Sequence, residues 1–141
     1  MRFNGVMQPA GKSGRDIVAL FHGVGLRPTR QRIALGKLLW RGGDRHVTAE
    51  QLFTEAQEDG VKLSLATVYN VLHQLTRAGL LRSLAVDAGR TYFDTNCIDH
   101  YHFYDEKTGL LEDIPADQIT IHYPAPEGRA IASVGLIIKT K

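Results

Sequence analysis

Cysteine is almost missing from this 141-residue chain, whose only one is Cys97. An internal disulfide and a zinc site built from cysteines are therefore excluded. No apolar run approaches the roughly 18 residues that would span a bilayer, which excludes a transmembrane helix and a membrane partner. The first residues, MRFNGVMQPAGKSGRD, lack the apolar core of a secretory signal peptide. With 43% hydrophobic and 23% charged residues, the composition is that of a globular protein, which we expect in the cytoplasm.

The net charge of +2 hides an uneven distribution along the chain. Residues 1–94 contain 13 Lys and Arg against 8 Asp and Glu, whereas residues 95–141 contain 4 against 7. A basic front half suits a polyanion such as DNA, and an acidic back half suits cations or self-association.

The front half predicts four helices separated by glycine and proline. Apolar residues recur at helical spacing in each, and Thr48 with Gln51 forms a capping-box pattern. The last helix ends at Gly79, a favoured left-handed position. After it, two segments of alternating polarity around residues 87–89 predict a hairpin. The helices are expected at residues 16–23, 29–41, 48–59 and 64–79.

The fourth helix has an apolar face and a polar face that carries Thr67, Tyr69 and Asn70. Three helices, a polar-faced fourth and a hairpin predict a winged helix-turn-helix over residues 14–95, whose last helix enters the major groove. Tyr69 offers apolar contact to a thymine methyl, and Asn70 offers a bidentate amide for adenine. A basic cluster lies at the start of the second helix and suits the phosphates of double-stranded operator DNA. It contains Arg27, Thr29, Arg30 and Arg32.

The back half, residues 96–141, predicts a second hairpin around residues 107–109, a short helix near 114–117 and a final strand over 131–140. So small a segment buries little core, and we expect it to form a homodimer. The predicted fold is α+β, an N-terminal winged helix-turn-helix followed by a small α/β dimerisation domain.

A metal signal lies in the back half. His100 and His102 are two apart on a strand and therefore point to the same face. Asp94 lies six residues earlier, and two acidic residues, Glu112 and Asp113, follow on the partner strand. Nitrogen and oxygen ligands suit Zn²⁺, Fe²⁺ or Mn²⁺.

Three blocks of the sequence resemble successive blocks of the ferric uptake regulator (Fur) family, with family-like order and spacing. They read GLRPTxxR from Gly25, HVTAE from His46 and LATVYNVL from Leu65, and the His-Tyr-His at 100–102 resembles the family's His-rich metal segment. The resemblance covers about residues 14–114 and implies a dimeric repressor, not an enzyme. It also implies one regulatory metal site, formed by His46, Asp94, His100 and His102 with Asp113 as a further carboxylate.

Two departures from the family's pattern stand out. The Cys-x-x-Cys of a structural zinc site made of four cysteines is replaced by Asp105 and Thr108, so we expect no such zinc. A second metal site in the dimer domain looks damaged, since Asp99 and Tyr101 occupy positions where a His and an Asp are expected.

The lack of cysteines, Asn70 and the His-Phe-Tyr at 102–104 look most like the iron response regulator (Irr) branch. That likeness implies control of iron homeostasis genes and haem as a cofactor held by His100 and His102, although no Cys-Pro haem motif occurs. Three alternatives stay open. They are a peroxide-sensing repressor, a metal-insensitive DNA-binding dimer, and a non-haem iron enzyme with a two-His-one-carboxylate site.

Overall fold

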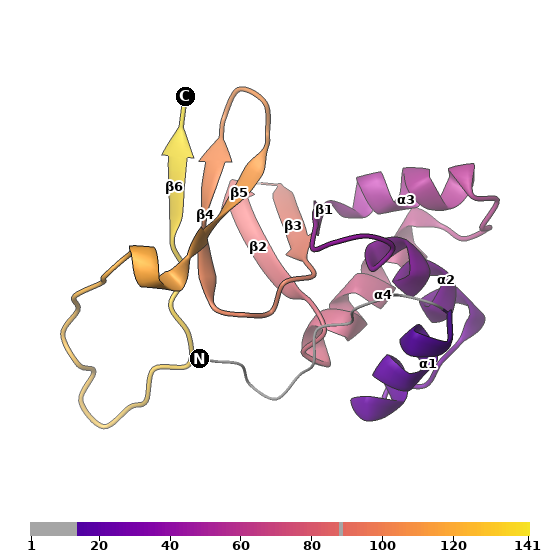
Figure 1. The fold of residues 1–141 in the computed structure, drawn as a ribbon, viewed down its shortest axis with the longest axis horizontal. Coiled ribbons are helices and arrows are strands. Elements are labelled where there is room, and N and C mark those ends of the chain that lie inside the picture. The colour runs from indigo at the N-terminus through magenta and orange to yellow at the C-terminus, as the bar shows by residue number, and fades with distance from the viewer. Residues whose placement is uncertain (1–13, 88) are drawn as a thin grey trace. The chain divides into compact units, whose positions relative to one another are not determined.

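The computed structural model of the chain describes residues 14–87 and 89–141 and divides into two compact units (Figure 1). We call the described residues up to Cys97 the helical unit and Ile98–Lys141 the sheet unit. Among the described residues, no helix combines the length and apolarity that crossing a membrane requires.

The helical unit contains four helices whose ends are set by local signals. Thr29, Thr48 and Ser64 each cap the helix that follows by accepting a backbone N–H, and Thr48 with Gln51 completes the predicted capping box. Gly79 has a φ of +84°, the left-handed conformation expected after the fourth helix. The helices are α1 (Gly14–Gly23), α2 (Arg30–Leu39), α3 (Ala49–Glu58) and α4 (Leu65–Arg77).

The apolar faces of these helices meet in one core that includes Phe21, Leu35, Leu72 and Phe93, all fully buried. Gly36 permits a close contact between helices, since a Cβ there would lie 2.7 Å from Ile17 Cγ2. The helices therefore pack by direct interdigitation at this position.

A three-stranded antiparallel sheet completes the helical unit, in the order β1 (His46–Val47), β3 (Arg90–Asp94), β2 (Arg82–Asp87). The β2–β3 hairpin is the predicted wing, and the α+β winged-helix prediction is confirmed. The two-residue strand β1 was not predicted, because two residues are too few to show a period.

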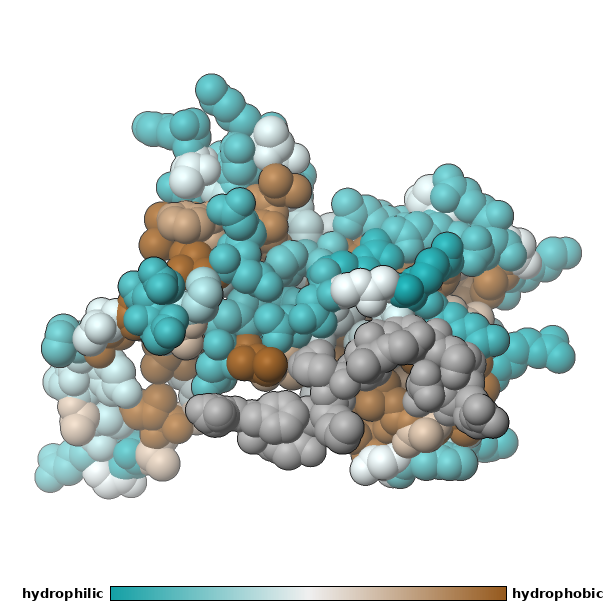
Figure 2. Space-filling view, in the orientation of Figure 1, coloured by the Kyte–Doolittle hydropathy of each residue, from teal (hydrophilic) through white to brown (hydrophobic). Residues whose placement is uncertain are grey.

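The sheet unit is built on β4 (His100–Asp105), which pairs antiparallel with β5 (Leu111–Pro115) and parallel with β6 (Ile137–Thr140). A 3₁₀ turn, Ala116–Gln118, follows β5. The predicted final strand over 131–140 is wrong in its first part, because only its last residues pair with β4. Figure 2 shows hydrophobic residues at the surface over this sheet, where Phe103 and Ile138 are register neighbours and 37% and 38% exposed.

Candidate functional site

Each unit contains one cluster of potential metal ligands. In the helical unit, His46 on β1 lies directly opposite Asp94 on β3. The His46 Nε2 is 3.2 Å from the Asp94 Oδ2, and Asp94 is 1% exposed. The other carboxylate oxygen, Oδ1, accepts the backbone N–H of Asn96 at 2.9 Å. Asp94 is therefore oriented by the chain, with Oδ2 turned to the imidazole.

The second cluster lies on one face of the sheet unit. His100 and His102 are two residues apart on β4, so their side chains lie on the same face of the strand. Asp113 on β5 is the register partner of His102. The Nε2 atoms of the two histidines are 3.4 Å and 3.5 Å from the same oxygen, Asp113 Oδ1. The three side chains thus converge on one point.

A backbone contact sets the tautomer of one of these histidines. The Nδ1 of His100 contacts the carbonyl oxygen of Ile98. Because a carbonyl oxygen only accepts, Nδ1 carries the proton, and Nε2 of the neutral ring has the lone pair. A metal-ligating histidine is held in this way by an outer partner.

The donor sets of both clusters fit a divalent transition metal. The ligand atoms within each cluster lie less than 4.8 Å from one another, which is close enough for a shared ion. Imidazole nitrogen with carboxylate oxygen suits Zn²⁺, Fe²⁺ and Mn²⁺. We call His46 with Asp94 the helical half-site, and His100, His102 and Asp113 the sheet half-site.

The face of α4 opposite the core presents three polar residues and one alanine. Ala66, Asn70, His73 and Arg77 are exposed at spacings of four, three and four residues, which places them on one stripe. Tyr69 lies beside this stripe, and its ring stacks on that of His73 with centroids 6.3 Å apart. The stripe is hydrogen-bonding and partly basic, as a helix that reads base edges requires.

The remaining predicted DNA contacts are arranged less uniformly. Arg27 and Arg30 are exposed. Arg32 donates to Gln74 Oε1 from Nε at 3.0 Å and from Nη2 at 2.9 Å, and to the Arg27 carbonyl from Nη1 at 2.8 Å. Arg32 therefore ties the start of α2 to α4. Thr29 and Thr67 take part in helix capping, Thr29 through its Oγ1 and Thr67 with Ser64.

Two acidic residues on α3 were missed by the sequence reasoning. Glu50 accepts the Tyr69 hydroxyl at 2.7 Å, and this hydrogen bond raises the pKa of Tyr69. Glu55 binds Arg45, which lowers the pKa of Glu55. Their partners are 19 and 10 residues away, so no local spacing signal exists.

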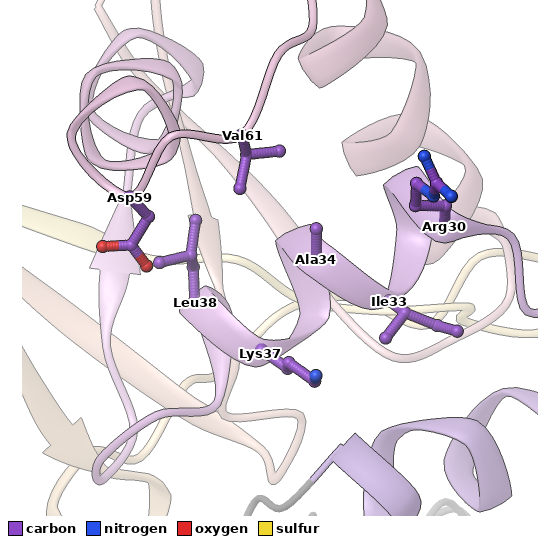
Figure 3. A pocket seen from close by; sticks show the side chains of 7 residues that line it. All are labelled: Arg30, Ile33, Ala34, Lys37, Leu38, Asp59 and Val61. Atoms are coloured by element: carbon purple, nitrogen blue, oxygen red, sulfur yellow. The ribbon is translucent and has the colours of Figure 1, made fainter.

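A shallow groove of about 490 Å³ runs along α2 in the helical unit (Figure 3). Arg30 and Lys37 flank apolar side chains there, and Asp59 at the far rim pairs with Arg41 at 2.9 Å. None of the half-site residues lines this groove, so the groove is separate from both half-sites.

Comparisons with known proteins agree with these features. The family profile described as "Ferric uptake regulator family" matches residues 23–128. A ferric uptake regulation protein of Bordetella parapertussis is 33% identical over 78 residues, which are 55% of this chain and 56% of that protein. A peroxide-responsive repressor PerR of Staphylococcus aureus is 29% identical over 104 residues, 74% of this chain and 70% of the relative.

A solved structure shares the fold. The ferric uptake regulator of Pseudomonas aeruginosa with manganese superposes with a TM-score of 0.71 at 24% identity, over 89% of this chain and 96% of that one. This likeness shows the fold alone, whereas the profile covers most of the sequence. The chain belongs to the ferric uptake regulator family.

Proposed function

We propose that this chain is a metal-dependent transcriptional repressor that binds operator DNA as a homodimer. Its family relatives are named as regulators and repressors, which speaks against the iron-enzyme alternative. In this proposal residues 14–95 read DNA and residues 96–141 dimerise and sense the metal. A cytoplasmic location accords with this function.

The metal role rests chiefly on the prepared geometry of the half-sites. Asp94 and His100 each have one polar atom held by the backbone and the other turned toward a second potential ligand. We propose that one divalent ion takes ligands from both half-sites. The bound ion would supply a positive charge beside the carboxylates of Asp94 and Asp113. Ligation across the two units would favour one of their arrangements and thereby raise operator affinity.

The DNA role rests on the exposed stripe of α4 and on the basic start of α2. Asn70 and Tyr69 are proposed to contact bases, and Arg27 and Arg30 to contact phosphates. Arg32, Thr29 and Thr67 would contribute by fixing the ends of α2 and α4, on which the contacting residues stand.

The nitrogen and oxygen ligands indicate a class of ion, which comprises Fe²⁺, Mn²⁺ and Zn²⁺. The solved relative that holds manganese supports Mn²⁺ as the first ion to test. Haem at His100 and His102, and membership of the iron response regulator branch, stay predictions that rest on the sequence resemblance.

Peroxide sensing is a second candidate, favoured by the similarity to the S. aureus peroxide-responsive repressor. In family members with this activity, bound iron leads to oxidation of a histidine ligand. Mass spectrometry after peroxide treatment of the iron-loaded protein would then find about 16 Da, one oxygen atom, added to a peptide that contains His46 or His100.

The main test is an operator titration with duplexes selected from a random pool, run with chelator, with Mn²⁺ and with haem. We expect tight binding only with Mn²⁺, and loss of that gain in the double variant His100→Ala, His102→Ala. His122→Ala, an exposed histidine of the same unit, is the matched control and should keep the gain. If the double variant binds operator as the unchanged protein does, the protein is a metal-insensitive DNA-binding dimer.

A further inference from the structure

An ion pair with two parallel hydrogen bonds lies next to the helical half-site. Arg45, the residue before His46, donates from Nη1 to Glu55 Oε1 at 2.9 Å and from Nη2 to Glu55 Oε2 at 2.6 Å. Its Nη1 also donates to the Leu38 carbonyl at 3.3 Å. With side chains 30% and 34% exposed, this pair is partly shielded from water, and its two-point geometry fixes the guanidinium.

The backbone of Arg45 continues the pairing that forms the half-site. Its N–H donates to Thr95 Oγ1 at 2.9 Å, and its carbonyl accepts the Thr95 N–H at 3.1 Å. Thr95 follows Asp94 and is fully buried. The residues that flank both ligands are thus bonded to each other, and Arg45 joins this pairing to α3.

The first turn of α3 follows the half-site strand β1 along the chain and also contacts α4. Only Thr48 separates β1 from α3, and its capping box fixes the first turn. Glu55 lies toward the far end of α3, while Glu50 in its first turn accepts the Tyr69 hydroxyl. His46 and the contact to the proposed base-reading tyrosine are therefore linked through the first turn of one helix.

We propose that Glu55 is a positioning residue for the metal, acting through Arg45, and that α3 transmits metal occupancy to Tyr69 through Glu50. The inference rests on the proposed function and adds a route inside the helical unit. Removing the outer partner of a metal ligand typically weakens metal binding by about 10- to 100-fold. Glu55 touches neither ligand and acts only through the Arg45 backbone, so the effect of removing it should be smaller than this.

The experiment measures Mn²⁺ affinity and the Mn²⁺-induced gain in operator affinity on the full chain. Glu55→Gln keeps the side-chain size but removes the negative charge and one of the two oxygens that accept from Arg45. We expect it to weaken Mn²⁺ binding by roughly three- to fivefold and to reduce the gain in operator affinity. The control is Asp59→Asn, which removes an exposed Arg–carboxylate pair just after α3 and should change either quantity less than about twofold.

Two further variants separate positioning from folding. Arg45→Lys retains the positive charge but cannot make two parallel hydrogen bonds to Glu55, so its Mn²⁺ affinity should be intermediate. This variant takes the place of Glu55→Gln if Glu55→Gln does not fold. Glu50→Ala should leave Mn²⁺ binding to the free protein unchanged while reducing the gain in operator affinity. Equal Mn²⁺ affinity in folded Glu55→Gln and the unchanged protein would overturn the positioning role, and a full gain in Glu50→Ala would overturn the transmission.

These outcomes are distinct from failure of the proposed function. If the unchanged protein binds operator equally with and without Mn²⁺, the repressor mechanism fails, and transmission through α3 fails with it. The comparison of Mn²⁺ affinities still decides the role of Glu55, because it needs no DNA.

Discussion

The two units of this protein differ in how they obtain a core. The helical unit buries seventeen apolar residues in one cluster, eleven of them with no exposed surface. Among the described residues of the sheet unit, the buried apolar side chains are Tyr104, Leu111 and Ile114, each 3% to 8% exposed. The helical unit thus has a large core, whereas the core of the sheet unit is small.

This difference agrees with the proposed division of labour. A DNA-reading surface needs a rigid scaffold, which a large core supplies. A small sheet with Phe103 and Ile138 on its surface gains stability when a second copy covers it, since isolated units of this size bury little surface. The proposed dimerisation would make the stability of the sheet unit depend on protein concentration.

The largest expected effect tests the cores directly. Leu72→Ala in α4, where the side chain is fully buried, should lower the free energy of unfolding by about 2–5 kcal/mol. Leu111→Ala in β5, 8% exposed in a thinner layer, should cost less than half as much. Denaturant titration of both variants provides the measurement. Equal losses of unfolding free energy would show that the core of the sheet unit is packed as tightly as that of the helical unit.

The next effect concerns the surface of the sheet unit. Phe103→Glu should weaken the proposed dimer by about 2 kcal/mol, a factor of roughly 30, because a charge replaces a central apolar contact. Analytical ultracentrifugation over a concentration series measures this. Leu110→Glu, at a position 66% exposed beside the β4–β5 turn, is the control and should remain a dimer. An unchanged dimer in Phe103→Glu would place the interface elsewhere.

The sequence predicted the helical unit well because its signals are local. Capping residues, glycines and helical spacing act over a few residues, and they located α2, α3, α4 and the wing. The strand over 131–140 was overextended because a mainly apolar segment looks like a strand whether or not a partner pairs with it. Regular pairing with β4 begins at Ile137, and before it the segment makes one hydrogen bond to β4, from the His102 N–H to the Leu136 carbonyl.

The half-sites show the same limit of sequence reasoning. The alternation of His100 and His102 on one strand was visible in the sequence, and the family resemblance supplied His46. The pairing of His46 with Asp94 depends on β1, which has no period to detect. The ties Arg45–Glu55 and Tyr69–Glu50 depend on tertiary packing of α3, so no spacing rule could find them.

A smaller effect probes how tightly the helical unit is packed. Alanine in place of glycine inside a helix normally stabilises it by about 1 kcal/mol. At Gly36 a Cβ would lie 2.7 Å from Ile17 and 3.1 Å from Phe21, both fully buried, so Gly36→Ala should instead destabilise by about 1–3 kcal/mol. Thermal melting measures the sign. A raised melting temperature would mean that α1 shifts to make room for the added methyl group. The helical unit would then be less tightly packed than its large core suggests.

The smallest effect is a pH dependence confined to the helical unit. The Arg45 hydrogen bond lowers the pKa of Glu55 below its value in the unfolded chain. Its stabilisation is therefore complete above pH 4.5 and is lost as the pH falls through the lowered pKa. Because the Glu55 side chain is 34% exposed, water screening keeps the contribution below about 1 kcal/mol. The free energies of unfolding of Glu55→Gln and the unchanged protein should differ at about pH 7, and this difference should shrink as the pH falls below 4.5. A difference that persists in acid would assign the loss to packing instead of charge.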